Sequence, residues 1–323
     1  MINNRAVPKL MAALAAIALT ASLSSCGSDD ASGSTAGGLT KLTVAVSPGA
    51  ATSAPMYLAA KNGVFKKHGL DIKLTVLANG SVAIPQVLNG QTQFSMASFA
   101  PVVQAVGKGL KIQIIGAANV IPTDPATKYQ GIVVRDGLDD LSKAKTFAAA
   151  STEVDPVQGY AVDKLGGRYK EMKLLAVDYP AIGDAVRQGN ADAALLAEPF
   201  LSGAIKAGGA KLLSYVTPAE SLSGTPGAVF IGAEKYMADH SKVTKDFMAA
   251  IQEAYKYGQD HLQEVANSVP ETGLNDKVPP VVALGEYQQG PLETAKVEQL
   301  VDLFKRYGVL DGAVTAADLV YQP

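Results

Sequence analysis

The stretch KLTVAVSPGAATSAPMYLAAKNGVFKKHGLDIKLTVL, residues 41–77, decides the fold. Its apolar run at 42–46 predicts a strand, which leads into a polar turn rich in Pro and Gly. A helix is predicted to begin near Ser53 and to end by Gly63, and a second strand is predicted over 72–77. A strand, a helix and a strand in this order are the repeating unit of a parallel sheet.

Strand and helix patterns keep alternating downstream of this stretch. They predict an α/β fold in which mostly parallel sheets are covered by helices on both faces. No internal repeat with a fixed period is visible in the sequence. The further strands are predicted over residues 94–97, 112–117, 131–134, 146–150, 174–177, 193–196, 212–216 and 228–232, and the further helices from the turn at 79–81 to 88 and over 101–106, 244–263 and 292–307.

Two turn clusters divide the chain, IPTDP at 121–125 and SLSGTPG at 221–227. If both are crossovers, residues 131–222 form lobe II, and residues 40–130 together with 223–323 form lobe I. A two-lobed body of this kind has a cleft between its lobes, where α/β sheets present the loops at the carboxyl ends of their strands. Hinge segments are predicted near residues 129–131 and 225–227.

The N-terminus has the layout of an export signal. Arg5 and Lys9 precede a mostly apolar run over 10–21, which is too short to remain as a membrane-spanning helix. The following Leu23-Ser24-Ser25-Cys26 resembles the lipobox of bacterial lipoproteins. This resemblance implies that residues 1–25 are a signal peptide, that Cys26 is lipidated, and that the protein is anchored on the extracytoplasmic face of the cell membrane. Residues 26–39 predict a flexible tether. The alternative is a stray thiol in a leader that is cut away.

Composition excludes several classes of partner. The chain has 28 Lys and Arg against 30 Asp and Glu, and removal of Arg5 and Lys9 with the leader leaves 26 against 30, a net charge of −4. A mildly acidic body argues against nucleic acid as a partner. Cys26 is the sole cysteine, so no disulfide within the chain is expected. The three histidines share no metal-ligand spacing. We expect a monomer without a metal or cofactor.

Three segments resemble one family, the periplasmic-type solute-binding proteins of nitrate, sulfonate, taurine and thiamine-precursor importers. They are PMYLAAKNGVFKKHGL at 55–70, LNGQTQF at 88–94, and QGNADAA at 188–194 with the Glu198-Pro199-Phe200 turn after it. The resemblance implies a two-lobed type II periplasmic-binding-protein fold that closes on a small ligand. It also implies delivery of that ligand to the permease and ATPase subunits of an ABC importer. The related pyrimidine-precursor synthases use cysteines that this chain lacks.

Candidate ligand-binding residues follow the predicted strands. Ser53 and Ser81 stand at predicted helix starts, where a hydroxyl and free amides bind an anionic oxygen group or the serine caps its helix. Phe99 either stacks on a flat ligand or packs in the core, which is favoured. A capping role is favoured for Asp155, and a structural role for Glu198. The candidates are Ser47, Ser53, Asn79, Ser81, Ser98, Phe99 and Asn119 in lobe I, and Ser151, Thr152, Asp155, Asp178, Tyr179 and Glu198 in lobe II.

Charge gives a slight indication of the ligand. The predicted cleft loops hold several carboxylates, and Lys128 and Arg135 are the nearest cations. A dianion usually recruits a bidentate Arg, so a monoanion such as an organic sulfonate or a nitrate-like anion, or a neutral thiamine-precursor-type heterocycle, is favoured. No catalytic motif is visible, and no enzymatic activity is expected. A ligand-sensing module that presents its ligand to a membrane receptor is the alternative, and a secreted enzyme on this scaffold is disfavoured.

Overall fold

The computed structural model describes residues 38–47, 50–77, 82–123, 130–152, 154–198, 200–216, 222–268, 286–310 and 314–323. All of them belong to one compact unit, Ser34–Pro323. The predicted signal peptide, the lipidation site Cys26 and the candidates Asn79 and Ser81 lie outside the described residues.

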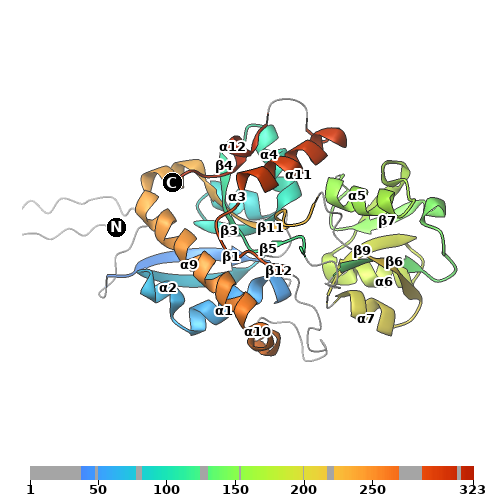
Figure 1. Cartoon of the computed structure of the whole chain (residues 1–323), viewed down its shortest axis with the longest axis horizontal. Coiled ribbons are helices and arrows are strands. Elements are labelled where there is room, and N and C mark those ends of the chain that lie inside the picture. Colours follow the sequence, from blue (N-terminus) through green and yellow to red (C-terminus); the bar gives the residue numbers. More distant parts are fainter. Residues whose placement is uncertain are drawn as a thin grey trace, which may run out of the picture. The chain divides into compact units, whose positions relative to one another are not determined.

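The first sheet has five strands in the order β2-β1-β3-β11-β4 (Figure 1). β1 is parallel to β2 and to β3, whereas β11 is antiparallel to both of its neighbours. Four of the five strands therefore point the same way, as the alternating pattern predicts. The strands are β1 (Thr40–Val46), β2 (Leu70–Val76), β3 (Phe94–Ser98), β4 (Ile112–Ala117) and β11 (Ala228–Ala233).

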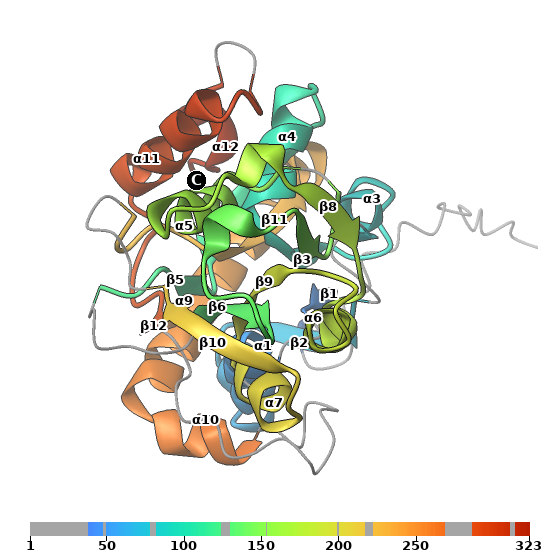
Figure 2. The ribbon, with the colours of Figure 1, turned by 90° about the vertical axis from the view of Figure 1, so that its right-hand side faces the viewer.

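The second sheet repeats this plan with the order β10-β6-β9-β7-β8 (Figure 2). β7 is parallel to β8 and to β9, and β6 is antiparallel to β9 and β10. In position and direction β7, β8 and β9 thus match β1, β2 and β3, although the sequence has no regular repeat. The strands are β6 (Gln130–Arg135), β7 (Thr146–Ala149), β8 (Lys173–Ala176), β9 (Ala193–Ala197) and β10 (Ala210–Tyr215).

Helices cover the sheets, and α1 and the helix predicted over 244–263 show the differences from prediction that matter here. α1 begins at Ala50 rather than near Ser53, and the helix predicted over 244–263 is broken near His261 into two. The α-helices are α1 (Ala50–Lys61), α2 (Val64–Lys67), α3 (Ala83–Leu88), α4 (Phe99–Gly107), α5 (Pro156–Lys164), α6 (Ile182–Arg187), α7 (Phe200–Lys206), α8 (Glu234–Asp239), α9 (Ser241–Asp260), α10 (Leu262–Ser268), α11 (Thr294–Arg306) and α12 (Ala316–Leu319), and the 3-10 helices are η2 (Leu141–Lys143), η3 (Tyr169–Glu171) and η4 (Tyr179–Ala181).

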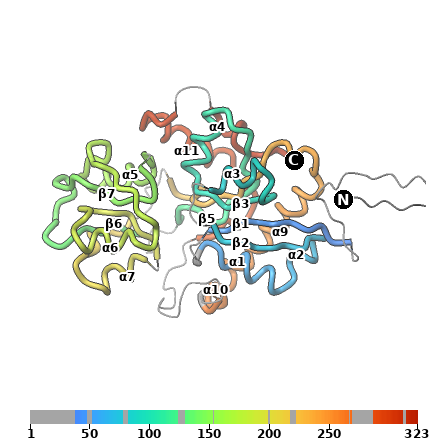
Figure 3. The backbone as a smooth tube through the Cα atoms, turned by 180° about the vertical axis from the view of Figure 1, so that it is seen from behind, coloured from blue at the N-terminus to red at the C-terminus, as the bar shows by residue number. Residues whose placement is uncertain are grey.

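Each sheet is buried on both faces, as a largely parallel sheet requires. Helices α1, α2 and α9 cover one face of the first sheet, and α3, α4 and α11 cover the other (Figure 3). On the first of these faces the rings of Phe94 and Phe247 stack with centroids 4.4 Å apart, and on the second Phe99 meets Phe304 edge to face. α5 and α6 cover opposite faces of the second sheet.

The chain passes between the sheets through two segments that lie side by side. The short strand β5 (Asn119–Val120) pairs with β12 (Glu286–Tyr287) and forms a bridge to Pro226. The amide of Ile121 donates to the carbonyl of Thr225 at 2.8 Å, and the amide of Gly227 donates to the carbonyl of Asn119 at 3.0 Å. These segments coincide with the turn clusters from which the two lobes were predicted. The lobe boundaries themselves remain a prediction.

Candidate ligand-binding site

The topology gathers most of the predicted ligand residues at two sheet edges. The carboxyl ends of β1, β2 and β3 meet at one edge of the first sheet, because these strands are parallel and adjacent. Ser47 and Ser98 lie at this edge. The carboxyl ends of β7, β8 and β9 meet in the same way, and Ser151, Asp178 and Glu198 follow them. We call these two edges the polar edges.

At the first polar edge Ser98 is the exposed hydroxyl. It is the last residue of β3 and the N-cap residue of α4, and its side chain makes no capping bond. Ser53 does not stand at the start of a helix, where the sequence predicted it. It lies inside α1, is 1 % exposed, and donates its hydroxyl to the carbonyl of Ser47 at 2.6 Å. Because that hydroxyl is buried and bonded, Ser53 joins α1 to Ser47, the residue after β1, and presents no donor to the polar edge.

Two further candidates from the first lobe have structural positions. Phe99 is buried against Phe304, so it packs in the core and is not placed to stack on a ligand. The side-chain oxygen of Asn119 accepts the amide of Ala228 at 2.8 Å, while its backbone carbonyl accepts that of Gly227. Asn119 therefore holds the two crossing segments together.

At the second polar edge Ser151 and Thr152 are exposed just after β7. The nearby Asp155 caps α5, because its carboxylate accepts the amides of Val157 at 2.9 Å and of Gln158 at 3.4 Å. Burial raises the pKa of Asp155, and the two amide hydrogen bonds offset this effect in part. The capping role favoured for Asp155 is therefore the one that the structure shows.

Tyr179 and Glu198 fix the loop that follows β9. The hydroxyl of Tyr179 accepts the amide of Ala197 at 3.2 Å, and burial raises the pKa of this phenol. Glu198 accepts the amide and the hydroxyl of Ser202 at 3.1 and 2.7 Å, so it holds the first turn of α7. Asp178 is exposed at the start of η4 and makes no capping bond. Of these three, Asp178 is the side chain left facing solvent at the edge.

A cavity of about 250 Å³ lies beside the crossing segments, and none of the predicted residues lines it. Small-molecule pockets commonly have volumes of about 300–1,000 Å³. One wall is a face of α5, whose residues recur at helical spacing and read from sequence as core. Sequence reasoning missed this cavity because its other walls come from distant segments. It is lined by Ile121, Pro122, Gln130, Val157, Tyr160, Ala161, Lys164, Leu165, Leu195, Ser214, Tyr215, Val216 and Leu222.

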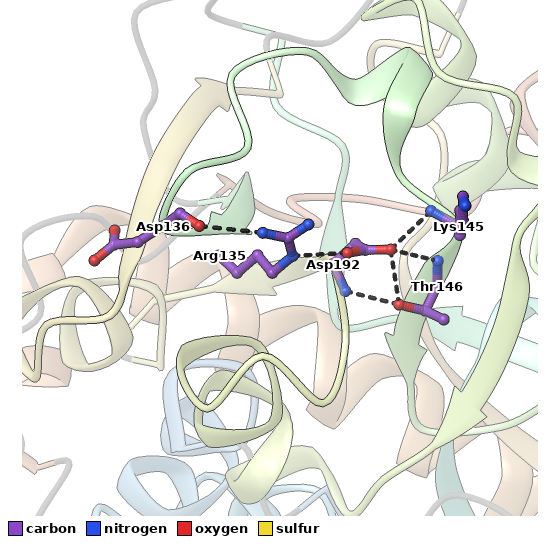
Figure 4. Close-up of polar contacts among 5 residues, drawn as sticks. All are labelled: Arg135, Asp136, Lys145, Thr146 and Asp192. Atoms are coloured by element: carbon purple, nitrogen blue, oxygen red, sulfur yellow. Dashed lines mark hydrogen bonds and ion pairs between the residues drawn. The ribbon is translucent and has the colours of Figure 1, made fainter.

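The QGNADAA segment leads into β9 and so lies at the opposite end of that strand from the polar edge. Figure 4 shows Asp192 of this segment beside Arg135, Lys145 and Thr146. The carboxylate of Asp192 accepts four hydrogen bonds. The donors are Nε of Arg135 at 2.8 Å, the backbone amides of Lys145 and Thr146 at 2.8 and 3.0 Å, and the hydroxyl of Thr146 at 3.0 Å. Burial alone would raise the pKa of Asp192, but these hydrogen bonds outweigh it and hold the pKa below its ordinary value. This segment therefore joins strands and does not contribute to the polar edge.

Within the described residues, no group of His, Cys, Asp and Glu side chains is arranged to hold a metal ion. The helices of the same residues include none with the length and apolar character needed to cross a bilayer.

Comparisons with known proteins agree with this architecture. A Bacillus subtilis (strain 168) protein named as a binding protein, YtlA, is 23 % identical over 252 residues, which are 76 % of this chain and 74 % of that protein. The ligand-binding component of an ABC-type import system from Staphylococcus aureus superposes with a TM-score of 0.70 at 12 % identity, covering 87 % of this chain and 96 % of the other. The alkanesulfonate-binding protein SsuA from Xanthomonas axonopodis pv. citri, bound to MOPS, superposes with a TM-score of 0.67 at 18 % identity, covering 87 % and 98 %.

These likenesses confirm the predicted fold, the type II periplasmic-binding-protein fold with two mixed sheets flanked by helices. The prediction of a binding protein rather than an enzyme agrees with the names of these relatives. The model of the family described as "NMT1/THI5 like" matches residues 50–265, which include both sheets except the first strand. The chain belongs to the NMT1/THI5-like family.

Proposed function

We propose that this protein is the solute-binding component of an ABC importer, which captures a small ligand between two lobes and delivers it to the permease and ATPase subunits. The observation that carries the proposal is the pair of polar edges, with Ser98 at one and Ser151 and Thr152 at the other. Membership of the NMT1/THI5-like family and the fold shared with the import component from Staphylococcus aureus support it.

The ligand class follows from the groups at the two edges. The exposed residues Ser98, at the start of α4, and Ser151 and Thr152, which follow β7, carry hydroxyls of the kind that hydrogen-bond the oxygen atoms of a ligand. We propose an organic sulfonate, a nitrate-like anion or a thiamine-precursor-type heterocycle. The MOPS-bound SsuA shows that a sulfonate is held by a protein of this fold.

A thermal-shift panel tests the ligand class. The full chain with Cys26→Ala, which keeps lipid out of the preparation, is heated with MOPS, taurine, nitrate or 4-amino-5-hydroxymethyl-2-methylpyrimidine. We expect one of these compounds to raise the melting temperature, because a ligand that binds the folded state alone stabilises it by about 2.7 kcal/mol at one hundred times its Kd. Calorimetry then measures stoichiometry, expected to be one. If no compound shifts the melting temperature at millimolar concentration, the proposed ligand classes are wrong.

We also propose that the mature protein is held on the outer face of the cell membrane through lipid on Cys26, by the resemblance of Leu23-Ser24-Ser25-Cys26 to a lipobox. In cells that express the wild-type precursor, the protein should incorporate a fatty-acid probe. The labelled protein should stay with the membrane fraction until detergent extracts it. The Cys26→Ala variant should take up no probe and keep its leader. Equal labelling of the two proteins would contradict lipidation at this residue.

A further inference from the structure

A polar contact joins a helix that covers the first sheet to a helix that covers the second. Tyr307, which ends α11, donates its hydroxyl to Oδ2 of Asp163 on α5 at 2.6 Å. The other oxygen of Asp163 accepts the amide of Tyr169 at 2.9 Å, so the carboxylate is held in place. α11 packs against the first sheet and α5 against the second, and they lie next to each other in Figures 1 and 2.

The phenol ring of Tyr307 fits against α5 because residue 159 is glycine. A Cβ at Gly159 would lie 2.6 Å from Cε1 of Tyr307 and 2.8 Å from Cδ1 of Tyr169, closer than real Cβ contacts. The ammonium group of Lys170 lies 5.2 Å from the centroid of the Tyr307 ring. Burial, followed by the hydrogen bond to Asp163, raises the pKa of Tyr307, so this phenol remains a donor at neutral pH.

Apolar and polar contacts extend this interface along α5. Val157 and Tyr160 are partly buried against the core that α11 and α4 form with the first sheet. Nε2 of Gln104 on α4 donates to the carbonyl of Val154 at 3.4 Å. None of the contacts between α11 and α5 is covalent, so the two helices can separate. The crossing segments adjoin the same core, since Leu222 belongs to it and Nζ of Lys296 on α11 donates to the carbonyl of Ser223 at 2.7 Å.

We propose that Tyr307, Asp163 and Gly159 form a latch that holds α11 against α5. The latch holds α11, which packs on the first sheet, against α5, which packs on the second. It therefore limits how far these two helices can separate. Its consequence for affinity rests on the proposed function: a protein already held near its binding geometry loses less free energy in reaching it, so loss of the latch weakens ligand binding. The latch itself does not depend on that function.

Distance measurements on the ligand-free protein test the latch. Spin labels on the exposed positions Lys108→Cys, at the end of α4, and Lys173→Cys, on β8, report the separation across the interface in the full chain carrying Cys26→Ser. Tyr307→Phe removes the donor and keeps the ring. We expect the ratio of separated to latched molecules to rise about tenfold to a hundredfold, because the lost bond goes to a charged acceptor.

Asp163→Asn keeps an oxygen for the amide of Tyr169 but replaces the charged acceptor by an NH2 group, which can only donate to the phenol oxygen in a weaker neutral bond. It should lengthen the distances less than Tyr307→Phe does, with no further effect in the double variant. The matched control is Tyr257→Phe, which removes a phenol–carboxylate bond of 2.5 Å to Glu264 between α9 and α10, both beside the first sheet. It should leave the distances unchanged. The latch is refuted if Tyr307→Phe gives the wild-type distance distribution, even with a lower melting temperature, or if the control shifts the distances equally.

Discussion

At the scale of single residues, Gln93 and Asp192 have the same structural role in the two sheets. Each directly precedes a strand, β3 or β9, and its side chain accepts a backbone amide of the neighbouring strand, from Thr43 at 2.8 Å or from Thr146 at 3.0 Å. The similar spacing of LNGQTQF and QGNADAA thus has a physical reason, the fixing of the start of β3 or β9 to the strand beside it. The sequence shows the motif, but the partners of Asp192 come from the end of β6 and the start of β7 and could not be read from it.

The Asp192 network predicts a dependence of stability on pH. The pKa of Asp192 in the folded state lies below the value of about 3.9 for an unfolded chain, so its contribution is complete above about pH 4 and is lost as the pH falls through the folded-state pKa. Asp192→Asn should lower the free energy of unfolding at pH 7 by about 1.5–3 kcal/mol, the usual worth of a hydrogen bond to a charged group. Denaturant titrations at several pH values measure the difference.

That difference between wild type and Asp192→Asn should shrink as the pH is lowered below about 4. Asp184→Asn is the control, since Asp184 makes an exposed pair with Arg187 within α6, and such pairs contribute about 0–1 kcal/mol. A difference that stays constant from pH 7 to pH 3 would mean that packing, and not the charge of Asp192, stabilises this end of the sheet.

At the scale of elements, the strands were predicted within a few residues because their apolar runs are bounded by turn residues. The start of α1 was not, because Ser53 resembled an N-cap residue and its hydroxyl instead bonds the preceding loop. The break between α9 and α10 at His261 comes three residues after Gly258, and the sequence prediction carried the helix through both residues. Local patterns thus indicate where an element exists, whereas its ends depend on tertiary hydrogen bonds.

The cap of α5 gives a prediction at this scale. Asp155 accepts two amides at the start of a helix that lines both the cavity and the latch. Asp155→Ala should lower stability by about 0.5–2 kcal/mol, which corresponds to a fall in melting temperature of about 2–4 °C for each kcal/mol. Asp302→Ala, an exposed carboxylate on α11, is the control. Calorimetric melting of the three proteins checks this, and equal melting temperatures would show that the cap contributes nothing.

At the scale of the whole molecule, the sequence predicted the class of the fold, the two crossovers and the position of the polar edges. These features follow from strand order and from the rule that parallel strands end together. The roles of single residues at the polar edges could be predicted less well from the sequence. Whether a serine or a phenylalanine after a strand faces solvent or the core depends on contacts from distant segments, as Ser53 with Met96 and Phe99 with Phe304 show.

The proposed capture of a ligand between the lobes makes a prediction about the two polar edges together. If one ligand touches both, then Ser98→Ala and Ser151→Ala should each weaken its binding about threefold to a hundredfold, because a lost hydrogen bond costs about 0.5–3 kcal/mol and about 1.4 kcal/mol corresponds to a factor of ten. Ser241→Ala, at the start of α9 and away from both edges, should bind normally. Calorimetry with the compound that raises the melting temperature measures the affinities. If one edge serine matters and the other does not, the ligand rests on one sheet alone, and closure of the lobes cannot be what retains it.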